Sequence, residues 1–250
     1  CRLIECDSQR ARVANESGSL ALHIACGNIE NVSIETLNFI IEHARETLAI
    51  SNKFGLLPIH KAVTAFCTQK SVGSIKFVAE AYLDGLSSRT LDGQLPLHLA
   101  LASPKVYSYS LVEMLVELNH SALNIPDKRG HYPLHKAASK ANIDPAIVDF
   151  LIEQAPGVVS IKDHNGSLPL HWAVAKDLPN LEVIYQLVAA YPEGLFDPDY
   201  EGHLPYDKLM HRSKSLGDIG AEMLNLMEFT RQQNLARRLK PMRVPSPTLR

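Results

Sequence analysis

The chain has 250 residues, of which 46% are hydrophobic and 21% charged, and its formal net charge is -2. This composition allows a sizeable folded body of one or two domains, and the near-neutral charge gives no global field that would favour nucleic acid or an acidic membrane surface. No apolar run approaches the ~18–20 residues of a membrane-spanning helix, and the charged start C-R-L-I-E-C-D-S does not fit a signal peptide.

Four cysteines lie in the first third of the chain: Cys1, Cys6, Cys26 and Cys67. None forms a C-x-x-C pair, which favours free thiols in a reducing, intracellular compartment, with the cytoplasm favoured over the nucleus. Because the first residue is not Met, we expect a fragment or a processed chain. Residues 1–14 are interpreted as an N-terminal lead or partial cap.

One phrase recurs along the chain. It is N-E-S-G-S-L-A-L-H-I-A from Asn15, and it returns from Asn52, Thr90, Asp127 and Asp163, with a divergent copy, D-Y-E-G-H-L-P-Y-D-K-L, from Asp199. The histidines of the phrase are separated by 37, 38, 37 and 36 residues. Such regular spacing predicts a repeat architecture, because each unit must bury its apolar face against its neighbours.

Each conserved position of the phrase has a physical reason. The glycine suits a tight turn with positive φ, the proline opens a helix, and the alanine allows helices to pack closely. These structural markers are Gly55, Pro58, His60 and Ala62 in the second copy, Gly93, Pro96, His98 and Ala100 in the third, Gly130, Pro133, His135 and Ala137 in the fourth, and Gly166, Pro169, His171 and Ala173 in the fifth.

A second amphipathic stretch follows each phrase, with apolar residues at helical spacing, as from Ile34, Leu111 and Ala146. Pro156 and Pro192 are expected to stop such helices. Short extended pieces such as V-V-S-I-K-D, at residues 158–163, are then expected to lead into the next turn. The predicted unit is therefore turn, helix, loop, helix and return.

The phrase resembles the ankyrin repeat, whose family pattern is D-x-x-G-x-T-P-L-H-x-A-A. The resemblance implies an all-α solenoid of five to six stacked helix–loop–helix units with short β-hairpin-like turns over residues 15–209, with copies starting near 15, 52, 90, 127, 163 and 199. Two departures stand out. The period exceeds 33 by three to five residues, and the family threonine before proline is lost, so the first helices lack a hydroxyl cap; its place is taken by Leu57, Leu95, Tyr132, Leu168 and Leu204.

The two ends of a stack need residues that tolerate water. In the sixth copy Asp207 replaces histidine and Leu209 replaces alanine, so this copy is interpreted as a terminal unit. Residues 210–239 are predicted to form a capping helix region, and residues 240–250 a disordered tail. From Arg231 onward the chain has six basic residues and no acidic one, which is typical of either a solvated helix end or a contact with nucleic acid or anionic lipid.

Catalytic and metal-binding patterns are not found. The histidines recur once per repeat, and stacked helices lie ~8–10 Å apart, too far for neighbouring copies to share a zinc ion at ~2.0–2.1 Å. We interpret them as hydrogen-bonding residues between repeats. The sequence has no G-x-S-x-G elbow and no phosphate loop, and Asp127, Asp163 and Asp199 are expected to bond their own backbone. We therefore predict no enzyme activity, no cofactor and no small-molecule substrate.

Trp172, the only tryptophan, directly follows a repeat histidine. Tryptophan is enriched at the centres of protein interfaces, but the equivalent residues in other copies are Ile24, Lys61, Leu99, Lys136 and Lys208. We favour packing between repeats over a partner contact.

The resemblance also implies where a partner would lie: along the turn tips and the concave side of the first helices. By position this selects tip residues Lys53, Phe54, Leu91, Asp92, Lys128, Arg129, His164, Asn165, Tyr200 and Glu201, and helix positions Thr64, Ala65, Ala102, Ser103, Ser139, Lys140, Ala175 and Lys176. These residues differ between copies while the frame is constant, which fits either a tunable surface or unconstrained solvated loops.

The sequence thus favours a monomeric, non-enzymatic scaffold or adaptor that binds another protein. One alternative is a regulatory or targeting arm of a larger enzyme or channel. Another is a nucleic-acid or anionic-lipid contact through the basic tail, which steep salt dependence would identify.

Overall fold

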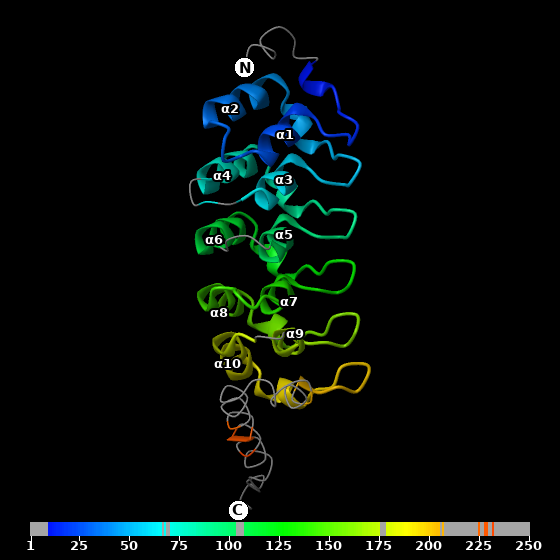
Figure 1. The fold of residues 1–250 in the computed structure, drawn as a ribbon, viewed down its shortest axis with the longest axis vertical. Coiled ribbons are helices and arrows are strands. Elements are labelled where there is room, and N and C mark those ends of the chain that lie inside the picture. The colour runs from blue at the N-terminus through cyan, green and yellow to red at the C-terminus, as the bar shows by residue number, and fades with distance from the viewer. Residues whose placement is uncertain are drawn as a thin grey trace, which may run out of the picture.

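The structure, a computed structural model, describes residues 10–66, 68, 71–103, 108–175, 179–205, 207, 225, 228–229 and 232. Within these residues the regular structure consists of α-helices and 3-10 helices, with no strand. The helices stack in two columns along an elongated molecule, and the turns project from one edge (Figure 1). The predicted all-α repeat solenoid is confirmed.

The first column holds the short helices that follow each glycine turn. Four of its helices begin at a proline, whose fixed φ suits the first helical position. These first helices are α1 (Ala21–Gly27), α3 (Pro58–Thr64), α5 (Pro96–Ala102), α7 (Pro133–Ala138) and α9 (Pro169–Val174).

The second column holds longer amphipathic helices. Four of them have a polar N-cap side chain that accepts a hydrogen bond from a backbone N–H of the first turn, supplied by Ser33, Ser108, Asp144 and Asn180. These second helices are α2 (Ile34–His43), α4 (Ser71–Ala81), α6 (Tyr109–Leu118), α8 (Pro145–Gln154) and α10 (Leu181–Ala190).

A 3-10 helix follows each second helix, where the sequence predicted an extended piece. For residues 158–160 that prediction was wrong. Pro156 opens the tight helix, and the Val158 N–H donates to the Ala155 carbonyl at 3.1 Å. These 3-10 helices are η2 (Arg45–Ala49), η3 (Leu83–Ser87), η4 (His120–Asn124), η5 (Pro156–Ser160) and η6 (Pro192–Phe196), and η1 (Arg10–Arg12) precedes the first turn.

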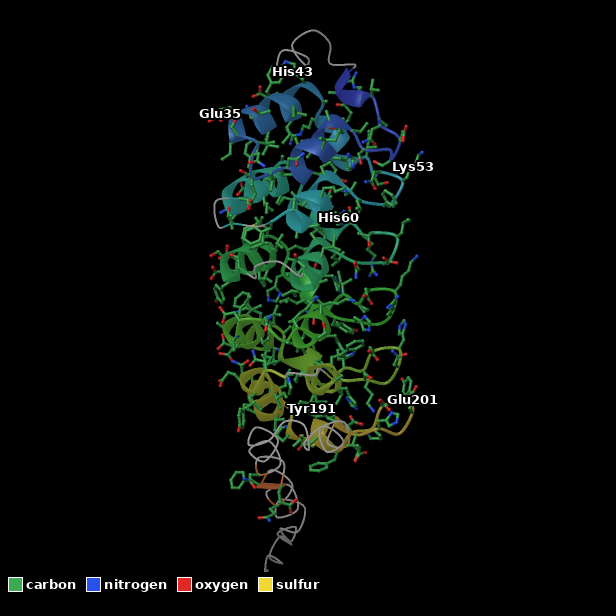
Figure 2. All side chains as sticks on the ribbon, viewed as in Figure 1. Glu35, His43, Lys53, His60, Tyr191 and Glu201 are labelled. Atoms are coloured by element: carbon green, nitrogen blue, oxygen red, sulfur yellow. The ribbon has the colours of Figure 1, made fainter. Side chains whose placement is uncertain are left out.

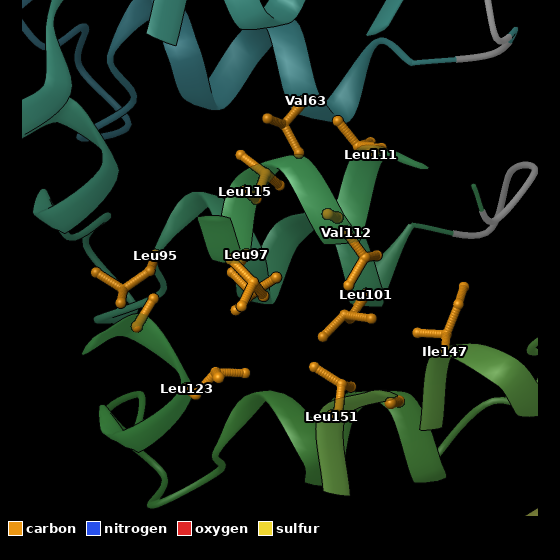
Figure 3. Close-up of a cluster of buried hydrophobic side chains, with 14 of the residues drawn as sticks. Val63, Leu95, Leu97, Leu101, Leu111, Val112, Leu115, Leu123, Ile147 and Leu151 are labelled. Atoms are coloured by element: carbon orange, nitrogen blue, oxygen red, sulfur yellow. The ribbon is translucent and has the colours of Figure 1, made fainter. Parts of the chain in front are cut away.

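One hydrophobic core runs the length of the described stack. Figure 3 shows its middle, where α5 and α6 meet the helices on either side. Leu101 is fully buried between α6 and the neighbouring helix α8, which contributes Leu151. Each layer therefore depends on the next for burial of its apolar face, as expected of a repeat solenoid.

The predicted boundaries at residues 1–14, 15–209, 210–239 and 240–250 stay predictions. Residues 1–9 and almost all of 210–250, including the expected capping helix and basic tail, lie outside the described residues. So do Cys1, Cys6 and Cys67. Cys26 is a free, buried thiol, and burial raises its pKa to about 12.

Candidate protein-interaction face

Each turn is closed by the first residue of the phrase. In the fifth copy the Asp163 Oδ1 atom accepts hydrogen bonds from the backbone N–H groups of Asn165 at 2.8 Å and Ser167 at 2.9 Å. Asp127 and Asp199 bond their own turns in the same way, which confirms the expectation for these three carboxylates. Asn52 does the same with its amide oxygen. The turns are thus braced from within.

Glycine is needed in these turns for two separate reasons at Gly166. Its φ is +76°, which side chains rarely tolerate, and a Cβ there would lie 2.5 Å from Cδ1 of Tyr200 in the next turn. At Gly202 φ is +84°, but no atom of the described residues lies within 4 Å of the Cβ position. The glycine therefore permits both the shape of the turn and the close approach of the following one.

Neighbouring turns are hydrogen-bonded into a ladder. In four of the five pairs of neighbouring turns, the N–H of the first tip residue donates to the carbonyl of the second tip position in the preceding turn: from Lys53 to Ser17 (3.1 Å), Lys128 to Asp92 (3.0 Å), His164 to Arg129 (3.1 Å) and Tyr200 to Asn165 (3.0 Å). The tips are consequently held at fixed spacing. Their side chains stand on an ordered backbone.

The ten predicted tip residues all have exposed side chains; we call them the tip row, and they are Lys53, Phe54, Leu91, Asp92, Lys128, Arg129, His164, Asn165, Tyr200 and Glu201. Three are large and apolar: Phe54 is 59% exposed, Leu91 61% and Tyr200 74%. Figure 2 shows Lys53 and Glu201 along the turn edge, on the side of the molecule away from Glu35 of α2. The structure therefore brings the tip row together on one edge.

The predicted helix positions are less uniform. The Ser139 hydroxyl donates to the Lys136 carbonyl at 2.8 Å, and the Lys140 ammonium donates to the Ala102 carbonyl of the preceding unit at 2.7 Å. Thr64 is exposed, but its hydroxyl donates to carbonyls within its own helix. Ala65, Ala102 and Ser103 are half-buried and Ala175 is exposed, while Lys176 lies outside the described residues.

The buried repeat histidines connect the first helices to the turns by hydrogen bonds. His135 shows the pattern: its Nδ1 accepts from the Tyr132 N–H at 3.3 Å, and its Nε2 donates to the Ser167 carbonyl of the next unit at 3.2 Å. The same pair of bonds is made by His23, His98 and His171, while His60 reaches the Ser88 carbonyl instead. The interpretation as hydrogen-bonding residues between repeats is confirmed.

This geometry requires the neutral imidazole, because Nδ1 must accept while Nε2 donates. Burial lowers the pKa of His60, His98 and His135 to about 4, against a smaller opposing effect of the carbonyl that each one contacts. The histidine also takes over the capping role of the missing threonine, because its Nδ1 accepts a hydrogen bond from the backbone N–H of the N-cap residue. Asp207 does this in the sixth copy, accepting from the Leu204 N–H at 3.3 Å.

Sequence reasoning missed a buried polar cluster between the fourth and fifth units. The Lys136 ammonium contacts Asp127 Oδ2 at 2.8 Å and His131 Nδ1 at 3.0 Å, and His131 Nε2 lies 3.3 Å from Asp163 Oδ2. Burial by itself raises the pKa of Asp127, but Lys136 and two backbone N–H groups lower it to about 2. For His131, burial and Lys136 lower the pKa, and both carboxylates oppose them. The signal for His131 is weak: the residue after the turn glycine is again histidine in the sixth copy, His203, but it is serine, leucine or glutamine in the other four.

Trp172 belongs to this cluster. Its indole N–H donates to Asp163 Oδ2 at 2.9 Å, and its ring meets His131 edge-on with centroids 4.9 Å apart. The side chain is half-buried, as a residue packed between repeats would be. Trp172 also lines a pocket of about 290 Å³ beside the last tips, together with Asn165, Ser167, His171, Ala175, Asp199 and Glu201.

Neither a candidate metal site nor a membrane-spanning helix occurs among the described residues. No group of His, Cys, Asp or Glu side chains there has the arrangement of a metal site. No helix in that part of the chain combines the length and the apolar character needed to cross a membrane.

Comparison with known families decides the fold. Residues 97–194 match the family model described as ankyrin repeats, in three copies. The fold is that of ankyrin repeats. No curated protein matches the chain. Ankyrin repeats generally serve protein–protein interaction and are typically non-catalytic, so the tip row is the surface to consider first.

Proposed function

We propose that this chain is a non-enzymatic scaffold or adaptor that binds a partner protein through the tip row and the adjoining first helices. The observation that carries this proposal is the tip row itself: ten exposed side chains on a backbone ladder braced by buried hydrogen bonds. We further propose that the ankyrin repeats extend beyond residues 97–194 to six copies over residues 15–209, because the same turn and the same cap recur at both ends.

A fixed backbone favours binding because less conformational entropy is lost on association. The frame and the tips divide the work: buried aspartates, glycines and histidines set the positions, while the exposed tip side chains differ from turn to turn. Phe54, Arg129 and Tyr200 are of residue types enriched in protein interfaces, and Leu91 adds exposed apolar area. Such a surface favours a macromolecular partner over a small molecule.

The chain carries features of an intracellular protein that acts as a monomer, and we include both in the proposal. Cys26 is a free thiol in the core, which suits a reducing compartment. Stacking already buries the apolar faces of the described helices without a second copy of the chain.

The test is capture from a cell lysate with the full chain as bait. Its matched variants are Lys53→Ala, Phe54→Ala, Arg129→Ala and Tyr200→Ala combined, and a control with four exposed second-helix carboxylates changed: Glu117→Ala, Asp149→Ala, Glu153→Ala and Glu182→Ala. We expect proteins retained by the native chain and by the control variant, and lost from the tip variant. Equal retention by all three chains would refute a role for the tip row.

One sequence feature favours a second candidate. The tail from Arg231 has six basic residues and no acidic one, so contact with nucleic acid or anionic lipid is the alternative. Binding that disappears on deletion of residues 231–250 and weakens steeply with salt would support it. A third candidate, a regulatory arm of a larger enzyme or channel, predicts that the captured partner or an attached domain carries the activity.

A further inference from the structure

The two columns of helices differ sharply in charge. Within the described chain, Lys76 is the only basic residue, apart from histidine, in the five second helices. Those helices carry many carboxylates: Glu35, Glu42, Glu80, Glu113, Glu117, Asp149, Glu153 and Glu182. The first helices carry none, and their charged residues are Lys61 and Lys136. The net charge of -2 conceals this separation.

Several described cations are held by carboxylates or backbone carbonyls, and the cations of the turn edge are not among them. Lys136 is neutralised by Asp127, Lys162 by Asp197, and Arg12 by Glu46. By contrast, Lys53, Lys61, Lys128 and Arg129 make no ion pair within the described residues. Lys53, Lys128 and Arg129 are exposed.

These cations occupy the middle of the turn edge, and carboxylates mark its two ends. Glu16 lies in the first turn and Glu201 in the last described one, both exposed. Between the cations stand the exposed apolar side chains Phe54 and Leu91. The middle of the edge therefore has three exposed cations, an apolar strip and one carboxylate, that of Asp92, so it is basic on balance, and it is bounded by negative charge.

We propose that the partner of this edge is an extended acidic polypeptide segment with a bulky apolar side chain between its carboxylates. The inference rests on the proposed function and specifies the partner's chemistry. Carboxylates of the segment pair with Lys53 at one turn and with Lys128 and Arg129 two turns further along. Its apolar side chain packs on Phe54 and Leu91. This contact excludes water, and the exclusion of water strengthens the charge pairs on either side.

The spacing of the turns sets the spacing expected in the segment. Stacked helices lie about 8–10 Å apart, and an extended chain rises about 3.3 Å per residue. The distance from one turn to the next therefore corresponds to about three residues of the segment. The distance between the two basic turns, which are two repeats apart, corresponds to about six. The expected pattern is acidic, then apolar about three residues on, then acidic again about three residues further.

Nucleic acid is the less favoured occupant of this edge. A phosphate backbone repeats its charge at every nucleotide and needs a continuous basic track. Here the carboxylate of Asp92 interrupts the row of cations. Of the two apolar side chains beside it, Phe54 has a ring on which a base could stack and Leu91 has none. A carboxylate-bearing segment with gaps between its charges matches this arrangement better.

The test is selection of displayed random peptides of about 12 residues on the full chain. Three chains are compared: the native one, a tip-reversed variant (Lys53→Glu, Lys128→Glu and Arg129→Glu), and a control with second-helix charges reversed (Glu117→Lys, Asp149→Lys and Glu153→Lys). Thermal melting beside each selection checks that the variants fold. We expect the native and control chains to enrich acidic peptides with an aromatic or aliphatic residue between the charges. The tip-reversed chain should bind those peptides about tenfold or more weakly, which corresponds to about 1.4 kcal/mol.

The outcomes separate this inference from the proposed function. A fourth chain, with Phe54→Ala and Tyr200→Ala, is added for this comparison: enrichment of neutral or basic peptides that is lost in it would overturn the acidic partner and leave binding by the tip row in place. No tip-dependent enrichment at all would overturn both. A labelled single-stranded oligothymidine that binds the native chain more tightly than the selected peptides, with loss in the tip-reversed variant, would reject the acidic partner in favour of nucleic acid.

Discussion

The first and second helices are built by different rules, although each pair forms one unit. Second helices are capped by their own polar N-cap residues, such as Asp144, whose carboxylate accepts from the Ala146 N–H at 3.0 Å. First helices have apolar N-cap residues and rely on the buried histidine, which also bonds the next unit. The second column is thus locally stabilised, whereas the first column, which adjoins the tip row, is stabilised by its neighbours. Acid, loss of a histidine and loss of a turn glycine should each damage the first column more.

The largest expected effect is that of acid. Because the folded pKa of His60, His98 and His135 is about 4, below the unfolded value of about 6.5, the unfolded chain binds more protons between these values. The contribution of these histidines to the free energy of unfolding is therefore complete above about pH 6.5. It is lost as pH drops towards 4, by about 1.4 kcal/mol per pH unit for each histidine. Three histidines together give on the order of 4 kcal/mol per unit.

Urea denaturation followed by circular dichroism across this pH range measures the slope. A His135→Gln chain keeps an amide in the site but cannot titrate, so its slope should be reduced by about one third. A slope that the substitution leaves unchanged would mean that other groups govern the acid response.

Removal of one repeat histidine should cost more than removal of a second-helix cap. His135→Ala leaves the Tyr132 N–H and the Ser167 carbonyl without their partner and opens a cavity, with an expected loss of about 3 kcal/mol. Asp144→Ala removes one exposed N-cap and should cost about 1 kcal/mol. Chemical denaturation of both variants compares them directly. Equal losses would contradict the view that the first column depends on its histidines.

Three glycines separate backbone strain from crowding in the turns. Gly166→Ala meets both, and we expect a loss of about 3 kcal/mol. Gly202→Ala meets only the positive φ, for about 1 kcal/mol, and Gly157→Ala meets neither, since nothing lies within 4 Å of its Cβ position. The decrease in melting temperature should be largest for Gly166→Ala, smaller for Gly202→Ala and smallest for Gly157→Ala. Similar values for Gly166→Ala and Gly202→Ala would show that the turns separate easily.

The repeat scaffold of turns and helices was predictable from the sequence because the residues that form it have the same structural role in every copy. The glycine turns, the proline starts and the bridging histidines recur at nearly constant spacing, so the pattern exposed them. Trp172, which completes the cluster around His131, occurs once in the sequence, and the 3-10 helices depend on local hydrogen bonds that no composition signal marks. Charge segregation was also hidden, because the acidic and basic residues alternate along the chain and separate only when the helices form two columns.

The smallest expected effect concerns the tip row, and it sharpens the contrast between frame and surface. Lys53→Ala, Phe54→Ala and Arg129→Ala remove exposed side chains from turns whose shape depends on Asn52 and Asp127. Each should change the free energy of unfolding by no more than about 0.5 kcal/mol. Tyr200→Ala should cost slightly more, because the ring lies against Gly166 of the preceding turn.

Denaturation of the four single variants tests this, with His135→Ala as the positive control. Losses near those of the frame would mean that the tip side chains vary for reasons of packing, and the case for a binding surface would fail with them. Unchanged stability would show that packing does not require the tip side chains, which leaves a binding surface or unconstrained loops. The large apolar side chains exposed among them favour a binding surface, and the capture experiment distinguishes the two.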